Sequence, residues 1–468
     1  PNAYQGLVGR LTYEYASRYL AEFNMGYNGT ENFAKGKRFG FFPAVSLGWV
    51  ISEEKFFPKN NIVKYLKVRG SYGEVGNDQI GGDRFLYLPS SYGAASDSGV
   101  NKYNFGLASN PYTSLMIVEN KIGNPDLTWE KAKKMNVGVD INLFNNCLTA
   151  SFDIFKEKRN NILANRSTSP MIIGANLPAY NFGEMENRGW EMDLNFRHHI
   201  QDFHYWARFN YSFARNEIIY MDEVQKRYDY QMTTGRRKNQ FFGLIFDGYY
   251  NSWEEINALD RPKSSWSGNQ LQPGDVKYVD VNQDGVIDDY DMVPIGYTPV
   301  PEIIYGFSFG AQYKGFDFSI LFQGADNVSI KYFGRSMWPF AKGEESAKSL
   351  IKERWTQERY EAGEKITFPR LSLNPNGETD HNYRPSTLWI RDASYLRLKN
   401  LEVGYTFTGG FVKRLNLNSV RLYFNGSNLF TWTDVVDLDP EAPSRSGNVE
   451  INTYPLQKVY NIGLNINF

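Results

Sequence analysis

The chain has 468 residues, a formal net charge of −1 and an aromatic content of 16%. Because 51 Lys and Arg are balanced by 52 Asp and Glu, the chain lacks the positive excess that neutralises phosphates, and no nucleic-acid partner is expected. The mean hydropathy of −0.51 and the lack of a long apolar run exclude helical membrane spans, which need about 20 mostly apolar residues.

The beginning of the chain does not have the features of a targeting segment. Residues 1–4 lack the charged and apolar regions of a signal peptide, and a strand pattern starts almost at once. The single cysteine, Cys147, allows neither an internal disulfide nor a cysteine metal cluster. We therefore expect the N-terminus to lie in the middle of a longer protein.

Alternation with a period of two dominates the sequence. In the first such segment Leu7, Leu11 and Tyr13 share one face, while Arg10 and Glu14 occupy the other. This pattern predicts β-strands, several of them longer than the usual five or six residues of soluble proteins. We count about thirteen predicted strands: 7–15, 19–27, 42–51, 66–72, 137–143, 148–154, 190–196, 203–213, 305–311, 316–322, 401–407, 420–424 and 460–468.

The connections between these strands alternate in length. Tight or modest connections follow the odd-numbered strands: 17–18, 54–64, 145–146, 198–202, 314–315 and 409–417. Long connections follow the even-numbered strands: 29–39, 78–126, 163–180, 221–301, 332–388 and 433–454. A transmembrane antiparallel β-barrel with short periplasmic turns and long extracellular loops has this arrangement, whereas a large β-sandwich has no reason to sort its loops in this way.

The order of the connections also predicts an orientation. If the short turns are periplasmic, the last strand ends in the periplasm at Phe468, where a terminal aromatic residue resembles the recognition signal of outer-membrane barrel proteins. Bacterial barrels have an even number of strands, and an open edge is not tolerated in lipid, where every backbone group must be paired. We therefore expect the first strand to pair with strands outside this sequence.

Six sequence blocks resemble one family of barrels. They are NGTENF (28–33), GFFPAVSLGW (40–49), KVRGSYG (67–73), NRGWE (187–191), IRDASYLRLKN (390–400) and NGSNLFTW (425–432). Together they resemble the SusC/RagA family of TonB-dependent outer-membrane transporters, and the resemblance covers essentially the whole chain.

The resemblance implies a 22-stranded barrel of which residues 1–468 form the C-terminal part, without the plug, TonB box and early strands. It implies active import of oligosaccharides or peptides with a SusD-like lipoprotein lid and TonB, in the outer membrane of a Bacteroidota-like Gram-negative bacterium. A dimer of transporter–lipoprotein pairs is a further option. The alternatives are a passive or structural barrel, such as a pore or adhesin scaffold, and a soluble secreted glycan-binding or glycan-cleaving β-protein.

A calcium-type loop lies within the long connection 221–301. Oxygen ligands at positions 1, 3 and 5, a Gly at position 6 and a backbone carbonyl at position 7 suit the hard Ca²⁺ ion. An Asp replaces the usual Glu at position 12, and the alternative is an acidic turn without metal. The predicted structural Ca²⁺ ligands are Asp280, Asn282, Asp284, Val286 through its carbonyl, Asp288 and Asp291.

No catalytic constellation accompanies these features. Three of the four histidines, His198, His199 and His204, flank one predicted turn, and His381 lies in a distant loop. The carboxylate pair Glu184 and Glu186 has no neighbour in the sequence that would raise one pKa for acid–base chemistry. We therefore expect no enzymatic activity.

Aromatic residues outside the predicted strands are candidates for contact with substrate or with the lid protein. Exposed aromatic faces stack on sugar rings or hold peptide side chains. The alternative is that these residues form small cores within the loops. The candidates are Trp253, Trp266, Trp338, Tyr249 and Tyr250.

Overall fold

The computed structural model describes most of the chain. The described residues are 3–79, 84–88, 93–94, 102–107, 110–115, 117–118, 122–168, 177–266, 271–332, 338–340, 349–372, 380–436, 438–441, 448–449 and 456–468. Among them, no helix is long and apolar enough to cross a membrane.

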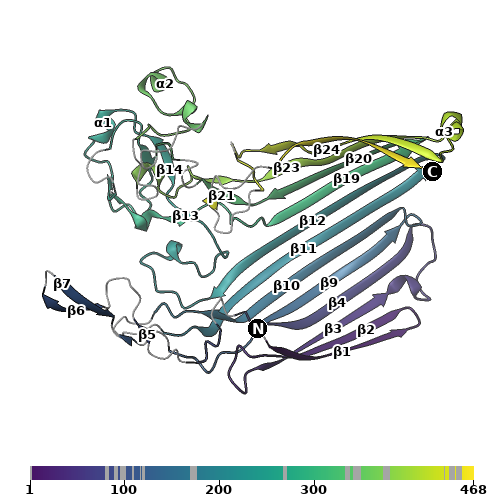
Figure 1. The fold of residues 1–468 in the computed structure, drawn as a ribbon, viewed down its shortest axis with the longest axis horizontal. Helices are drawn as coiled ribbons and strands as arrows, with labels where there is room; N and C mark the ends of the chain where they lie inside the picture. The colour runs from purple at the N-terminus through teal and green to yellow at the C-terminus, as the bar shows by residue number, and fades with distance from the viewer. Residues whose placement is uncertain are drawn as a thin grey trace.

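One antiparallel sheet of thirteen strands forms the body of the protein (Figure 1). Each strand pairs with the next sheet strand along the chain, and β1 and β26 form the two edges. The predicted all-β fold and strand number are confirmed. The strands are β1 (Tyr4–Tyr15), β2 (Tyr19–Thr30), β3 (Phe39–Val50), β4 (Val63–Asn77), β9 (Glu130–Leu143), β10 (Leu148–Ala164), β11 (Tyr180–Ile200), β12 (Phe203–Tyr220), β19 (Ile303–Tyr313), β20 (Phe316–Asp326), β23 (Tyr395–Phe407), β24 (Ser419–Thr433) and β26 (Val459–Asn467).

Short and long connections lie at opposite ends of the sheet (Figure 1). The β19–β20 hairpin turns through Lys314 and Gly315, which both have positive φ. The β9–β10 turn uses positive φ at Asn145 and Asn146, and Asn tolerates this left-handed conformation better than most residues. The predicted alternation of loop length is therefore confirmed in the structure.

The two faces of the sheet differ in polarity. On the outer face of the last strand pair, Leu422 lies opposite Leu464 and Phe424 opposite Ile462, and all four side chains are exposed. An apolar surface of this extent is rare on a soluble monomer and suits contact with lipid. The opposite face carries charged and amide side chains.

A separate layer of small elements is built from the long connections (Figure 1). Its centre is a core of buried side chains that includes Leu244, Val276, Tyr332, Phe368 and Trp389. The short strand β21 (Ser329–Tyr332) joins two distant connections, because it pairs with both β22 (Ile390–Asp392) and β25 (Asn448–Val449). The connections that follow β12, β20 and β24 therefore fold as one packed unit, which we call the loop unit.

The remaining short elements belong to the connections. The strands are β5 (Gly93–Ala94), β6 (Lys102–Leu107), β7 (Asn110–Leu115), β8 (Ile117–Val118), β13 (Phe242–Gly243), β14 (Phe246–Tyr249), β15 (Lys263–Ser264), β16 (Val276–Tyr278), β17 (Val286–Ile287), β18 (Val293–Pro294), β21 (Ser329–Tyr332), β22 (Ile390–Asp392) and β25 (Asn448–Val449). The helical elements are η1 (Ile51–Glu53), η3 (Asp229–Gln231), α1 (Trp253–Ile256), η4 (Asp289–Asp291), η7 (Ser349–Glu353), α2 (Gln357–Glu361), η9 (His381–Tyr383) and α3 (Gly410–Arg414).

Candidate functional site

The polar face of the sheet carries ion pairs that span several strands. Arg69 on β4 donates to Asp153 on β10 through two bonds of 2.7 and 2.6 Å, and it also contacts Asp140 on β9. To reach Asp153, the Arg69 side chain crosses over Gly138 of β9. A Cβ at Gly138 would lie 2.5 Å from Asp153 Oδ1 and 2.8 Å from Arg69 Cζ. Glycine is required here because the guanidinium occupies the space of a side chain.

The same arrangement recurs near the C-terminus. Arg421 on β24 reaches across β23 to Asp317 on β20 and also pairs with Glu402 at 2.6 Å. The strand between them again has a glycine, Gly404, at the crossing point. Charge is thus neutralised within the face, as expected for a wall that lines a polar interior.

A third arginine connects the sheet to the long connection after β24. Arg397 on β23 is 2% exposed, and it pairs with Asp439 at 2.7 Å and with Glu441 at 2.5 Å. A buried arginine is stable only when carboxylates compensate its charge. This triad therefore holds residues 439–441 against the rim of the barrel wall.

The candidate contact aromatics occupy different environments in the loop unit. Tyr249, Trp266 and Trp338 pack against the buried core, and the Arg384 guanidinium covers the Trp266 ring at 4.2 Å. Tyr250 is 6% exposed and packs with Ile256 and Leu271. Trp253, at the start of α1, is 55% exposed. The structure thus places four candidates in loop cores and leaves Trp253 open to a partner.

The histidines are also separated. His199 and His204 face each other across the β11–β12 hairpin with ring centroids 5.5 Å apart, whereas His381 is buried in the loop unit. Nε2 of His381 lies 2.8 Å from the Val276 carbonyl oxygen, so it must donate, and Nδ1 accepts from the Ser264 hydroxyl at 2.9 Å. Burial lowers the pKa of His381. This histidine is a neutral structural link.

The carboxylates Glu184 and Glu186 each form an ion pair. Lys158 contacts Glu184 at 2.9 Å, and Lys156 contacts Glu186 at 2.8 Å. Both pairs join β10 to β11 across the ladder. Their partners explain these acidic residues without acid–base chemistry.

The calcium-type loop closes on its own backbone amides. Asp280 accepts hydrogen bonds from the amides of Gln283 (2.7 Å) and Gly285 (2.8 Å), and both of those residues have positive φ. Asn282 and Asp284 each accept from the amide two residues further along, at 2.9 Å. The loop therefore curls so that the side chains at positions 1, 3 and 5 bend inward.

The end of the loop forms a capping box on η4. Asp288 accepts from the Tyr290 amide at 2.7 Å, and Asp291 accepts from the amides of Asp288 (2.9 Å) and Val281 (2.8 Å). Asp291 is fully buried, and this burial raises its pKa despite the amides that it accepts. Within the described part of the chain, no three or more His, Cys, Asp and Glu side chains converge as a metal centre. The residue types and the tight turn at Gly285 suit a Ca²⁺ loop although the carboxylates do not converge, and Ca²⁺ at this loop stays a prediction.

A cavity of about 400 Å³ lies where the polar face meets the long connections. It is bounded by the ends of β10, β11 and β12 that are remote from the short turns, by residues 237–238 and by the segment before β19. Its lining residues are Glu130, Glu157, Arg159, Ile162, Met185, Glu186, Asn187, Ala214, Asn216, Arg237, Lys238, Thr298, Val300, Pro301 and Glu302.

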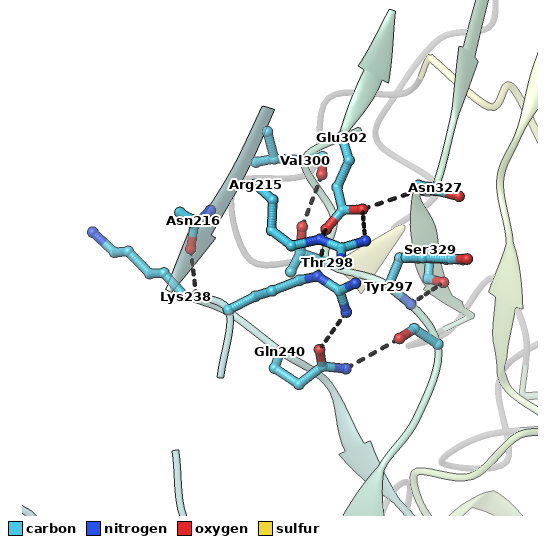
Figure 2. A network of polar contacts seen from close by, with 12 residues as sticks. Arg215, Asn216, Lys238, Gln240, Tyr297, Thr298, Val300, Glu302, Asn327 and Ser329 are labelled. Carbon is cyan, nitrogen blue, oxygen red and sulfur yellow. Dashed lines mark hydrogen bonds and ion pairs between the residues drawn. The ribbon is translucent and has the colours of Figure 1, made fainter. Parts of the chain in front are cut away.

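A hydrogen-bond network organised by Glu302 forms one wall of this cavity (Figure 2). The buried Glu302 carboxylate accepts two bonds from Arg215, at 2.9 and 2.8 Å, one from Arg237 and one from Asn327 at 3.1 Å. Burial acts to raise the pKa of Glu302, but the hydrogen bond from Arg215 and the two guanidinium charges outweigh it and lower the pKa. Glu302 is therefore a fixed anion that positions two arginines.

Of the cavity residues, sequence reasoning considered only Glu186, as one half of a carboxylate pair that it rejected as catalytic. A usable signal was present in Lys156–Glu157–Lys158–Arg159, where four charged residues follow one another within a strand pattern. Charged residues on both faces of a strand indicate that this part of the strand lies outside the lipid. The side chains that face the barrel interior there are therefore candidates for a site. Arg237, Lys238 and Glu302 lie in a loop without periodicity and offered no such signal.

Comparisons with known proteins agree with this architecture. The sequence profile of the family described as "TonB dependent receptor-like, beta-barrel" matches residues 3–429. TonB-dependent receptor P3 of Formosa agariphila is 28% identical, with 99% of this chain and 45% of that protein covered. TonB-dependent receptor SusC of Bacteroides thetaiotaomicron is also 28% identical, with 100% and 44% covered. The chain thus spans a little less than half the length of these relatives.

Solved structures show the same fold. The structure titled "Structure of the RagAB peptide importer in the 'open-open' state" has a TM-score of 0.75 and 23% identity, and the match covers 100% of this chain and 47% of that one. The resemblance to SusC and RagA that the sequence blocks carry is confirmed, and a family of transport proteins agrees with the expected lack of enzymatic activity. The chain belongs to the TonB-dependent receptor-like β-barrel family.

Proposed function

We propose that the protein is a SusC-like TonB-dependent importer of oligosaccharides or peptides across the outer membrane of a Bacteroidota-like bacterium. The match of residues 3–429 to the receptor family carries this proposal. In this proposal the sheet of thirteen strands is part of a larger barrel, and its edge strands β1 and β26 pair with the other strands of that barrel. Edge strands in lipid need such partners for their backbone groups.

In this proposal the partners are a SusD-like surface lipoprotein that acts as a lid and TonB, which acts through the plug region. The relatives named SusC and RagAB support this assignment. Trp253 is the candidate lid contact, because its side chain is exposed on α1 in the loop unit. Mass spectrometry of ligands that co-purify with the complete transporter distinguishes glycans from peptides. Co-purification of large adhesin partners without any small ligand would favour the structural alternative.

We also propose that Asp280, Asn282, Asp284, Val286, Asp288 and Asp291 hold a structural Ca²⁺ ion in the loop unit. The buried Asp291 supports this role, because a nearby cation compensates a carboxylate that burial otherwise disfavours. Bound Ca²⁺ would neutralise the acidic loop and stiffen it.

Chelation tests the calcium proposal. EGTA should lower the thermal midpoint of the complete transporter, because a ligand that binds only the folded state stabilises it. Asp284→Asn keeps an oxygen to accept the Val286 amide but loses a charge, so it should reduce the response to calcium. Asp289→Asn is the control, since Asp289 lies outside the predicted ligand set. No change on chelation in the wild type contradicts the proposal.

A further inference from the structure

The cavity beside Glu302 has a lining suited to charged ligand groups. Of the described residues that line it, none is aromatic. A neutral sugar ring is held in large part by stacking on an aromatic face, and this lining offers no such face. Fixed charges, in contrast, form their strongest hydrogen bonds with ionised groups.

Every carboxylate in the lining has a cationic partner. The pairs are Glu130–Arg159 (3.0 Å), Glu157–Arg159 (2.7 Å), Glu157–Lys134 (3.2 Å), Glu186–Lys156 (2.8 Å), Glu302–Arg215 (2.8 Å) and Glu302–Arg237. Five cations therefore compensate four carboxylates before Lys238 is counted. The four lining carboxylates are thus neutralised by ion pairs, partly with cations outside the lining, and these pairs do not involve Lys238.

Lys238 is the lining cation that these ion pairs leave out. Its backbone amide donates to Asn216 Oδ1 at 2.7 Å, which fixes the main chain at this point. Figure 2 shows its ammonium group directed away from the Glu302 network, and no ion pair joins it to any residue that the structure describes. Lys238 is therefore an exposed cation of the cavity lining whose main chain is held and whose side chain is left to bind a ligand.

We propose that this cavity is a subsite for a carboxylate of the imported ligand, which Lys238 binds. The inference rests on the proposed function and narrows the substrate class to acidic oligomers. The carboxylate belongs either to a peptide or to an oligosaccharide that contains a uronic acid. A neutral oligosaccharide offers Lys238 only hydroxyl acceptors, which bind an ammonium group less strongly than a carboxylate does.

The test uses the complete transporter and two pairs of ligand pools. One pair is a protease digest of casein and the same digest with its carboxylates methyl-esterified. The other is an oligogalacturonate pool and its carboxyl-reduced counterpart. Pools are incubated with the purified protein, and retained ligands are measured by mass spectrometry after size-exclusion chromatography.

Wild-type protein should retain one acidic pool over its esterified or carboxyl-reduced counterpart, and the retained pool identifies the source of the carboxylate. Lys238→Ala should weaken retention about tenfold, as expected for the loss of one charge-assisted hydrogen bond. Lys238→Arg should restore it. Lys226→Ala, an exposed lysine of the same connection outside the cavity lining, should have no effect.

Three results overturn the subsite: retention of neither acidic pool, equal retention of each acidic pool and its esterified or carboxyl-reduced counterpart, or equal losses in Lys238→Ala and Lys226→Ala. Uptake by energised cells is scored separately. If the acidic pool is retained but uptake does not depend on TonB, the importer proposal fails and the subsite remains. If uptake depends on TonB without an acidic preference, the subsite alone fails.

Discussion

Single residues on the polar face are constrained by side chains that cross over them. Arg69 can pair with Asp153, two strands away, only because Gly138 on the intervening strand has no Cβ. Sequence periodicity assigns Arg69 to the polar face but gives no indication of this crossing. The partner lies 84 residues away in the chain, and its identity follows from strand register.

Gly138→Ala should destabilise the barrel by about 1–3 kcal/mol, the usual range for inserting a methyl group where no space exists. Gly70→Ala is the matched control, because a Cβ on Gly70 would meet only the Asn136 carbonyl oxygen, at 3.9 Å. Urea unfolding of the complete transporter in detergent, followed by heat-modifiable gel mobility, measures the difference. Equal stabilities of the two variants would show that Arg69 moves aside without cost.

At the scale of elements, the strands were predictable and the loop unit was not. Alternating apolar residues located every sheet strand, but β11 extends from Tyr180 to Ile200, well beyond the predicted 190–196. Outside the lipid, outward positions need not be apolar, and ion pairs such as Lys156–Glu186 continue the ladder instead. The loop unit depends on contacts between distant segments, for example β21 with β25, which no local pattern encodes.

The buried His381 should make the loop unit sensitive to acid. Burial lowers its pKa, so the unfolded segment binds a proton more readily than the folded one. Stability is then complete above the unfolded pKa of about 6.5 and falls as the pH drops toward the lower folded pKa. The neighbouring Asp275 and Asp380 act in the opposite direction but do not reverse the shift.

Limited proteolysis of the loop unit between about pH 8 and about pH 5, a range that brackets the histidine pKa, measures this effect. Wild-type protein should become more susceptible on the acidic side, and His381→Gln should give a flatter profile. His198→Gln, at an exposed position of the β11–β12 hairpin, is the control. A profile unchanged by His381→Gln would assign the acid sensitivity to other groups.

At the scale of the molecule, the two ends of the sheet are expected to lie on opposite sides of the membrane. In a Cys147→Ser background, Trp253→Cys in the loop unit should react with a membrane-impermeant maleimide on intact cells. Lys413→Cys in α3, at the end with short turns, should react only after the outer membrane is permeabilised. The reverse pattern would contradict a periplasmic C-terminus at Phe468.

The whole-molecule architecture joins an apolar outer face, a charge-paired inner face and a packed loop unit. The first two were predictable, because they follow from strand periodicity and from residues such as Arg10 and Glu22, which pair at 2.7 Å. The cavity beside Glu302 depends on loop residues that only the folded chain brings to the barrel rim. Ligand specificity is therefore expected to depend on the connections together with the strand ends that line the cavity.

The most direct test of the account is uptake of a labelled ligand identified by co-purification, in cells that produce the complete transporter. Uptake should be saturable and should be lost when TonB is deleted or the proton-motive force is collapsed. The same ligand should still bind to the cell surface under those conditions. Uptake that continues unchanged without TonB and without energy would identify a passive pore and contradict the account.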